Sequence, residues 1–446
     1  MSELQPRFNT RYVLMITFIS AMGGYLFGFD FAVISGALPF LKTEFGLDEY
    51  WEGFTTASLA LGCIVGCLVA SEFSRLKGRK PALMAAAMIF LVSSVSMAFA
   101  PSLGWFICAR FFAGVGVGMA SMLSPMYIAE IAPANLRGRM VAVNQLTIVS
   151  GILITTIVNY YLSKTGLDSW RWMFGLGAAP SFLFVLGVII LPESPRWLVA
   201  NGFPGKAEQV LTKIGGKEYA QSTVNDIVQS FGRSSSISLR TVFQKAFLPS
   251  VFIGIGLAVF QQFCGINVVF NFTTTIFQSI GFSQDDQLKQ TMLIGIINLV
   301  VTLLAMSQVD KIGRKALMLM GAAGLAVLYV ISAILLKMNS PLAAYSLLGA
   351  IGIYGLSLAP VTWVLISEIF PNKIRSAATT IAVVSLWLAY GILVFTFPIF
   401  SRMVGVYALF YVYAAVCLLG FVFVWFKVKE TKGKSLEEMD DIFIGH

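Results

Sequence analysis

The segment Ser71–Lys80 reads SEFSRLKGRK, and the segment Met306–Lys315, far along the chain, reads MSQVDKIGRK. Both end in the same Gly-Arg-Lys triplet, and two further pairs of motifs follow them at nearly the same spacing. These pairs are EIAPANLR at Glu130–Arg137 with EIFPNKIR at Glu368–Arg375, and PESPRW around Glu193 with KETKGK around Glu430. Self-similarity at a fixed long spacing indicates a structural unit that is used more than once. The sequence therefore predicts two related halves.

Long apolar runs occupy most of the chain. Hydrophobic residues make up 57% of it and charged residues only 12%, whereas soluble domains carry about 25% charged residues. Runs of about 20 apolar residues cross the hydrocarbon layer, and they are helical because every backbone polar group in lipid must be bonded within the segment. Twelve such runs are predicted, at residues 12–37, 52–72, 81–100, 104–129, 139–162, 171–191, 247–280, 290–309, 316–337, 343–367, 377–402 and 406–427.

The fold class is therefore an all-α membrane protein with twelve transmembrane helices in two six-helix halves. No cleavable signal peptide is evident, so the first run is interpreted as a retained helix. The predicted units are residues 1–198, a polar linker at 199–246, residues 247–427 and a tail at 428–446. Within the linker, Lys206–Ile214 is expected to form an amphipathic helix whose apolar face holds Ala207, Val210, Leu211 and Ile214.

Lysine and arginine residues are distributed unevenly between the two sides of the predicted bundle. Most of the 31 lie near the termini or in the loops after even-numbered runs. The exceptions are Arg110, inside a run, and the residues of the other side: Lys42, Lys164, Arg171, Lys289, Lys337 and Arg402. Because positive loops stay in the cytoplasm, we expect a protein of the inner (plasma) membrane with both termini cytoplasmic. The net charge of +9 reflects this topology, and scattered basic residues indicate no nucleic-acid binding.

Cysteine and histidine offer little chemistry in this chain. The five cysteines lie in apolar runs without metal-ligand spacing, where packing is their usual role: Cys63, Cys67, Cys108, Cys264 and Cys417. The single histidine is the last residue, His446. We therefore expect no metal, no cofactor and no enzymatic activity.

Asp30 is the one acidic residue deep in an apolar run, and Arg110 is the one deep basic residue. A charge at the bilayer centre costs about 2.5–3.5 kcal/mol on insertion scales, so Asp30 needs a partner, a proton or both. The simplest arrangement is that the two side chains face each other. Burial disfavours the charged carboxylate and a neighbouring arginine favours it, so a proton-dependent switch is one interpretation. A static structural pair is the alternative.

Amide side chains gather in the run at 247–280, at Gln261, Gln262, Asn267 and Asn271. Four amides within about three helical turns cannot all face lipid. Each primary amide offers an acceptor and two donors, which suits neighbouring hydroxyl groups that both donate and accept. The alternative role is hydrogen bonding between helices.

Residues in other runs extend this cluster. Gln145 and Asn298 add polar side chains, and Trp363 adds a flat aromatic face and an N–H group. Aromatic faces and a few placed polar groups are typical of small-molecule sites. No cationic cluster is available for an anionic substrate, so the pattern favours a neutral polyol.

The charged residues of the repeated motifs fall at helix ends on the predicted cytoplasmic side. They are Glu130, Arg137, Glu193, Glu368, Arg375 and Glu430. We expect these residues to form ion-pair networks across the halves, which would close the inner side when the outer side is open. The alternative is a role in orientation and folding.

Together these motifs resemble the sugar porter family of the major facilitator superfamily. The resemblance extends from Gly23 to about Glu438, and within the family the chain is similar to bacterial proton symporters for xylose and hexoses. Its motifs are GGYLFGFD, ARFFAGVGVG, PMYIAEIAPANLRGR, PESPRWL, QQFCGIN, VDKIGRK, WVLISEIFPNKIR and ETKG. The resemblance implies the major facilitator fold and alternating access.

The resemblance also implies roles for individual residues. Asp30 would be the proton-coupling carboxylate and Arg110 its partner, because the symporters carry an aspartate there and the facilitators an asparagine. Asp310 and Arg314 would carry the second copy of the cytoplasmic gate. The sugar contacts implied are Phe27, Gln145, Gln261, Gln262, Asn267, Asn298 and Trp363.

Three places depart from the family pattern. Arg75 and Leu76 stand where the first gate motif has an acidic and a basic residue. Asn271 and Phe272 replace paired tyrosines, and Leu386 replaces a glutamine of the xylose symporters. The last two changes bear on which sugar is bound.

We therefore expect a proton-coupled symporter that imports a neutral monosaccharide, either a pentose or a hexose. Its partners are the sugar, the proton and the lipid bilayer, and we expect a monomer. A facilitative uniporter without proton coupling is the first alternative, which Asp30 disfavours. A transporter-like sugar sensor is another, disfavoured by the short tail.

Overall fold

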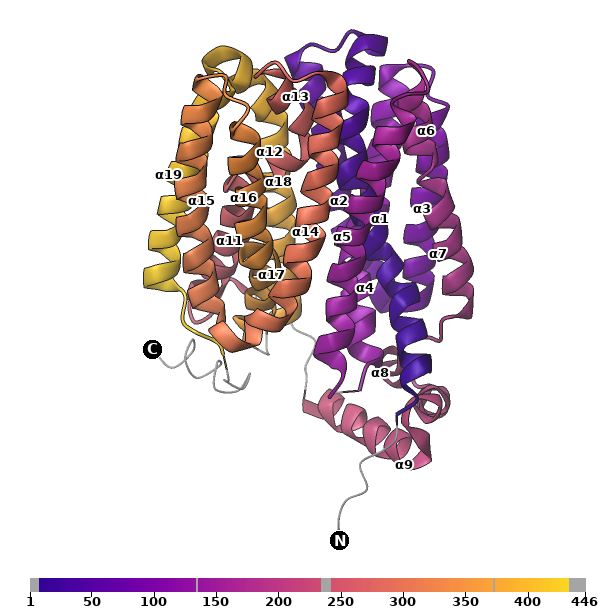
Figure 1. Cartoon of the computed structure of the whole chain (residues 1–446). Coiled ribbons are helices and arrows are strands. Elements are labelled where there is room, and N and C mark those ends of the chain that lie inside the picture. Colours follow the sequence, from indigo (N-terminus) through magenta and orange to yellow (C-terminus); the bar gives the residue numbers. More distant parts are fainter. Residues whose placement is uncertain (1–7, 134, 234–241, 372–373, 433–446) are drawn as a thin grey trace.

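The computed structural model describes residues 8–133, 135–233, 242–371 and 374–432. Within these ranges the regular secondary structure is entirely helical. Twelve helical segments among the described residues are long and apolar enough to cross a membrane, and each overlaps one of the predicted runs. Figure 1 shows two adjacent bundles, the N-terminal half in indigo to magenta and the C-terminal half in orange to yellow. The predicted fold class is confirmed.

Six membrane spans form the N-terminal half. The first five are single helices and the sixth comprises two: α1 (Thr10–Phe45), α2 (Glu49–Lys77), α3 (Arg79–Ala98), α4 (Leu103–Ile131), α5 (Arg137–Leu162), α6 (Ser169–Gly175) and α7 (Ala178–Ile190). The side chain of Asn9 caps α1 by accepting from the N–H of Tyr12, and Gly46 ends the helix with a φ of 60°. Such caps satisfy backbone groups that the helix leaves open at its ends.

The C-terminal half repeats the arrangement with two broken spans. Its helices are α11 (Leu248–Phe263), α12 (Ile266–Asn271), α13 (Thr273–Gln278), α14 (Gln284–Ile312), α15 (Arg314–Lys337), α16 (Ala343–Leu356), α17 (Leu358–Glu368), α18 (Arg375–Val404) and α19 (Val406–Lys427). Gly265 separates α11 from α12 with a φ of 87°, and a Cβ atom there would lie 2.4 Å from the ring of Tyr413. Only glycine fits both conditions. Ser357, at φ −128° and ψ −86°, separates α16 from α17.

The linker between the halves begins with α8 (Pro195–Ala200) and α9 (Pro204–Arg233). Ala207, Leu211 and Ile214 are fully or almost fully buried and Val210 is half-buried, which confirms the predicted amphipathic face. The N–H of Asn9 donates to the carbonyl oxygen of Ile214 over 2.7 Å. The linker therefore packs beneath the start of α1 (Figure 1).

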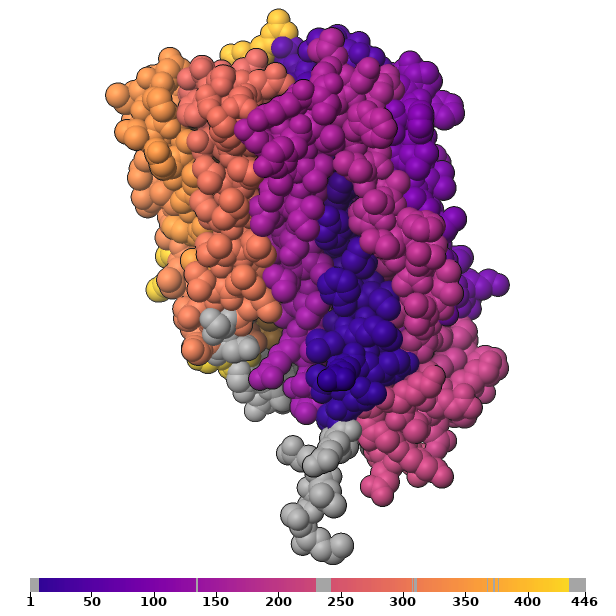
Figure 2. Space-filling model, turned by 45° about the vertical axis from the view of Figure 1, so that its right-hand side comes forward, coloured from indigo at the N-terminus to yellow at the C-terminus, as the bar shows by residue number. Residues whose placement is uncertain are grey.

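Both ends of the described chain lie at one end of the bundle, which we call the terminal end; the other is the opposite end (Figure 1). The two halves pack along two seams, α2 against α18 and α5 against α14. Figure 2 shows the second seam, where the orange C-terminal half lies against magenta α5. Any site between the halves is therefore bounded by α1 and α5 on one side and by the broken spans on the other.

Candidate functional site

A cavity of about 1130 Å³ lies between the two halves. Its deep part is lined by amide and aromatic side chains, among them Gln145, Gln262 and Trp363. Its lining continues to Arg137, at the start of α5, and to Glu368, at the end of α17, both at the terminal end. The cavity thus reaches from the middle of the bundle to the terminal end.

The breaks in two spans position the amide cluster of the cavity. Gln261 and Gln262 lie in the last turn of α11 and Asn267 in the first turn of α12, so the kink at Gly265 brings the three amides together. The Nε2 of Gln262 donates to the Oε1 of Gln261 over 3.3 Å, and the Nδ2 of Asn267 donates to the Oε1 of Gln262. Discontinuous helices near mid-membrane carry the substrate sites of many transporters.

Most of the predicted sugar contacts line this one cavity. They are Phe27, Gln145, Gln261, Gln262, Asn267, Asn298 and Trp363. Asn271 differs, because it is fully buried and is not among the lining residues. Its Nδ2 donates to the carbonyl oxygen of Asn267 over 2.7 Å, and its Oδ1 accepts from the hydroxyl of Tyr390 over 3.0 Å. The amide of Asn271 is therefore engaged with the protein.

Sequence reasoning missed Asn144, which lies on α5 directly before Gln145. Asn144 lines the cavity, and its Oδ1 has no hydrogen-bond partner among the described residues. A buried acceptor without a donor costs free energy unless a ligand or water supplies one. The adjacent Gln145 was the signal that a polar patch lies here, and both neighbours line the cavity.

Asp30 and Arg110 form the predicted pair outside the cavity lining. The Nη1 of Arg110 lies 3.3 Å from the Oδ1 of Asp30, and both side chains have no exposed surface. The Oδ2 of Asp30 and the Nε and Nη2 of Arg110 have no hydrogen-bond partner among the described residues. The guanidinium carbon lies 5.7 Å from the centre of the Phe174 ring. One hydrogen bond therefore joins two buried ions, each with hydrogen-bonding capacity left over.

Contacts between the halves close the opposite end. The Oε1 of Glu52 on α2 accepts from the Oγ1 of Thr275 on α13 over 3.3 Å, and its Oε2 lies 2.7 Å from the Nζ of Lys42. The Glu52 side chain is only 2% exposed. Arg402 pairs with Glu49, again across the halves. Sequence reasoning missed this group because Glu52 lies in the first turn of α2, where acidic residues are common for helix capping alone.

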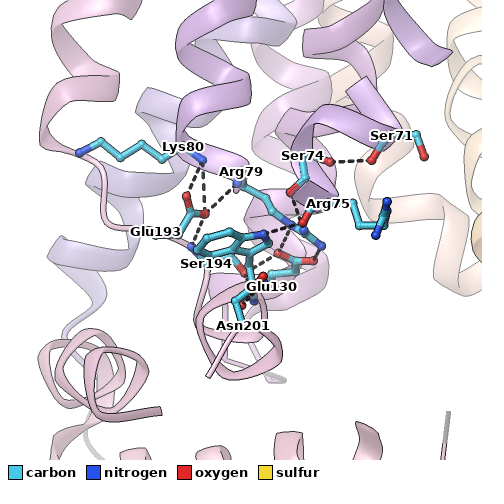
Figure 3. Close-up of polar contacts among 10 residues, drawn as sticks. Ser71, Ser74, Arg75, Arg79, Lys80, Glu130, Glu193, Ser194 and Asn201 are labelled. Atoms are coloured by element: carbon cyan, nitrogen blue, oxygen red, sulfur yellow. Dashed lines mark hydrogen bonds and ion pairs between the residues drawn. The ribbon is translucent and has the colours of Figure 1, made fainter. Parts of the chain in front are cut away.

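At the terminal end, the first repeated motif builds a network within the N-terminal half (Figure 3). The Nη2 and Nε of Arg79 donate to Glu130 over 2.8 and 3.0 Å, and the hydroxyl of Ser194 also donates to Glu130. Glu193 accepts from the backbone N–H of Arg79 over 2.8 Å and from that of Lys80. Three helix ends, those of α3, α4 and α8, are thereby held together.

The second copy repeats this network in the C-terminal half. The Nη2 of Arg314 lies 3.3 Å from the Oε1 of Glu368, and the hydroxyl of Thr431 donates to the Oε2 of the same carboxylate over 2.6 Å. Glu430 accepts from the backbone N–H of Arg314 over 2.9 Å and from that of Lys315 over 3.0 Å. The internal repeat of the sequence is thus a repeat of the same hydrogen bonds. We expected networks across the halves, but these pairs join residues of one half, because each half contributes a whole copy of the motif set.

The pKa values of the two equivalent carboxylates are shifted in opposite directions. Burial raises the pKa of Glu193, and its backbone N–H donors offset only part of that effect. Burial also acts to raise the pKa of Glu430, but its four N–H donors outweigh burial and leave the pKa lowered. As pH falls, Glu193 therefore takes up a proton before Glu430, and the network of the N-terminal half is the more acid-sensitive.

Three other predicted gate residues have different surroundings. Arg137 begins α5 and lines the cavity. The guanidinium of Arg375 donates to the carbonyl oxygen of Phe370 over 3.2 and 3.0 Å. The side chain of Asp310 lies outside the described residues. Arg75, which departs from the family pattern, pairs with Glu72 on the same helix, so its charge is balanced locally.

Gly78→Ala and Gly313→Ala should each destabilise the folded protein. Gly78 has a φ of 105°, and a Cβ atom there would lie 2.2 Å from the Oε2 of Glu193. Gly313 has a φ of 104°, and a Cβ atom there would lie 2.7 Å from the Oε2 of Glu430. Strain of this kind costs about 1–3 kcal/mol per residue. Thermal unfolding in detergent should report a lower midpoint for both variants. Gly138→Ala is the control, since a Cβ there meets no atom within 4 Å. Equal unfolding midpoints for all three variants would contradict the requirement for glycine at positions 78 and 313.

Two six-span bundles on either side of a cavity with amide side chains define a secondary transporter of the major facilitator type. The chain belongs to the family described as "Sugar (and other) transporter", whose model matches residues 16–443. This confirms the family expected from the motifs and makes the chain a multi-pass membrane protein of a transporter family.

Two relatives and one solved structure indicate where in the family the chain lies. The chain is 37% identical to the D-xylose-proton symporter of Escherichia coli (strain K12), over 99% of this chain and 97% of that protein. It is 34% identical to the arabinose-proton symporter of Bacillus subtilis (strain 168), over 97% and 95%. The structure of the xylose transporter XylE from E. coli in a partially occluded inward-open conformation matches with a TM-score of 0.86 and 37% identity, covering 95% of this chain and all of that chain.

Proposed function

We propose that this protein imports a neutral monosaccharide together with a proton by alternating access. One observation carries the proposal: the structure combines a fully buried Asp30–Arg110 pair with a cavity between the halves that is lined by amide side chains. The similarity to symporters of xylose and arabinose supports the same conclusion. A facilitative uniporter is the second candidate, but uniport requires no proton-binding group and so gives no reason for the buried carboxylate of Asp30.

The chemistry of the cavity suits a sugar. Gln262, Asn267 and Asn298 line the cavity and supply amides that can both donate to and accept from hydroxyl groups. Trp363 gives the cavity a flat apolar face. The arginines of the lining, Arg137, Arg139 and Arg314, lie at the starts of α5 and α15 and not beside the amide cluster, so a neutral polyol fits that cluster better than a sugar phosphate.

The proton provides the driving force for accumulation. Asp30 binds it, and the resulting neutral carboxyl releases Arg110 from its ion pair. A membrane potential of 100 mV supplies about 2.3 kcal/mol per transported charge. Because 1.4 kcal/mol is a factor of ten, this alone supports a roughly fifty-fold sugar gradient.

We place the terminal end in the cytoplasm, because most lysine and arginine residues lie near the termini and in the loops of that end. In this orientation the cavity opens inward, and the contacts of Glu52, Thr275, Glu49 and Arg402 form the closed outer side. These contacts must break when the transporter turns outward. The networks around Glu130 and Glu368 then act as rigid ends of each half.

Gln262→Ala and Trp363→Ala should each weaken sugar binding. A lost hydrogen bond that leaves its partner unsatisfied costs about 1–3 kcal/mol, which corresponds to a roughly five- to 150-fold higher Kd. Isothermal titration calorimetry of the purified protein measures this change. Gln278→Ala removes an exposed amide on α13 and serves as the control. Affinities equal to wild type in both cavity variants would return the amide cluster to a packing role.

The proposal is tested by uptake into proteoliposomes. A panel of labelled D-xylose, L-arabinose and D-glucose is offered with and without an inward proton gradient. Symport predicts that the gradient drives at least one sugar above its external concentration. Equilibration without accumulation would favour the uniporter, and no uptake of any neutral monosaccharide would overturn the proposal.

A further inference from the structure

Tyr390 lies between the proton-binding pair and the sugar-binding amides. It is on α18 in the C-terminal half, and its side chain is fully buried. Its ring stacks on that of Phe31 on α1, with ring centres 5.0 Å apart and planes 26° apart. Phe31 directly follows Asp30 in the chain. The residue next to Asp30 is therefore in direct ring contact with the other half.

The hydroxyl of Tyr390 continues this route toward the cavity. It donates to the Oδ1 of Asn271 over 3.0 Å, and the Nδ2 of Asn271 donates to the carbonyl oxygen of Asn267 over 2.7 Å. The side chain of Asn267 in turn donates to Gln262, and both residues line the cavity. The set Phe31, Tyr390, Asn271 thus joins the two sites by contacts between buried groups, and we call it the Tyr390 relay.

Tyr390 is a titratable group of the other half that interacts electrostatically with Asp30. Titratable groups that interact electrostatically with Asp30 include Arg110 on α4, Cys63 on α2 and Tyr390 on α18. Arg110 and Cys63 belong to the same half as Asp30. Coupling between binding sites requires contacts that differ between two states, and a contact between halves changes when the halves move.

We propose that Tyr390 is a positioning residue that couples the proton on Asp30 to the geometry of Asn267 and Gln262, and thereby to sugar affinity. The inference rests on the proposed proton–sugar symport. While Asp30 is charged, its bond to Arg110 holds α1 and Phe31 in one position against Tyr390. Protonation releases this bond, and the stacked rings and the Asn271 hydrogen bond carry the displacement to α12.

The test is the ratio of sugar Kd at alkaline pH to that at acidic pH, measured on purified protein with the panel sugar that binds wild type most tightly. Coupled binding sites typically differ by about 5- to 150-fold, so the wild-type ratio should fall in that range. In Tyr390→Phe the ring stack remains, but the hydroxyl is lost, and the ratio should fall toward one. Asn271→Leu removes the acceptor and should give the same result by a second route.

Tyr329→Phe is the matched control. Tyr329 is also a fully buried tyrosine of the C-terminal half, but its hydroxyl has no hydrogen-bond partner among the described residues. This variant should keep the wild-type ratio. A wild-type ratio in both Tyr390→Phe and Asn271→Leu would overturn the relay and leave symport intact. A ratio of one in wild type itself, unchanged by Asp30→Asn, would overturn the proposed symport and the relay together.

Discussion

Asp30→Asn should abolish accumulation of sugar against its gradient while leaving sugar binding and counterflow in place. The amide of asparagine is neutral, as is a protonated aspartate, but it cannot release a proton. Asp30 is fully buried and is not among the residues that line the cavity, so sugar contacts persist. In proteoliposomes with a potential of 100 mV, the ratio of internal to external sugar should fall from as much as about fifty-fold to one.

Glu52→Gln is the control for loss of any buried carboxylate. Glu52 is as deeply buried as Asp30 but lies at the opposite end, against Lys42 and Thr275. An altered outer contact changes the rate of the cycle, whereas at a given proton driving force the limiting gradient depends only on the coupling stoichiometry. We therefore expect Glu52→Gln to reach the wild-type gradient at a different speed. Full accumulation of sugar by the Asp30→Asn variant would contradict a role for the Asp30 carboxylate in proton coupling.

Gly53→Leu should force the opposite end open and stop uptake. Gly53 lies where α2 crosses α18, and a Cβ atom would lie 2.2 Å from the carbonyl oxygen of Phe395. Real Cβ atoms essentially never come that close, and backbone cannot yield as a flexible side chain does, so α2 and α18 must separate. The seam between these helices joins the two halves, and its separation favours the state in which the cavity faces outward.

Spin-label distances measure this shift directly. Labels on cysteines introduced at the exposed positions Leu167 and Met338, in a Cys108→Ser background, report the opposite ends of the two halves. Gly53→Leu should lengthen the distance between them and abolish sugar uptake. Gly104→Leu is the control, because a Cβ there meets no atom within 4 Å. Unchanged distances in Gly53→Leu, together with normal uptake, would contradict rocking of the halves about the cavity.

Much of the fold follows from patterns that physical chemistry makes strict. Apolar runs long enough to cross a membrane can only be helices, and the repeated charged motifs indicate two equivalent halves. Those motifs became two matching networks around Glu130 and Glu368. The breaks at Gly265 and Ser357 were not predictable, because an apolar run with one glycine or serine is also compatible with a continuous helix.

The candidate site was predictable in its residue types and less so in its orientations. Asp30 and Arg110 stand out because a buried charge demands a partner, and the two side chains do meet. Asn271 and Asn144 illustrate the limit. Both are amides on cavity-forming helices, yet the first is engaged with Tyr390 and the second lines the cavity. The direction in which an amide points depends on the side chains of the neighbouring helix. The sequence alone does not show which of those side chains lie next to it.

Proton movement during downhill sugar entry tests the central claim most directly. Proteoliposomes are suspended in a weakly buffered medium without an initial proton gradient, and the transported sugar is added outside while the external pH is recorded. Symport through Asp30 predicts that the medium becomes alkaline as sugar enters, that a protonophore abolishes the change, and that Asp30→Asn gives none. Sugar entry at the wild-type rate with no change of external pH would contradict proton-coupled import.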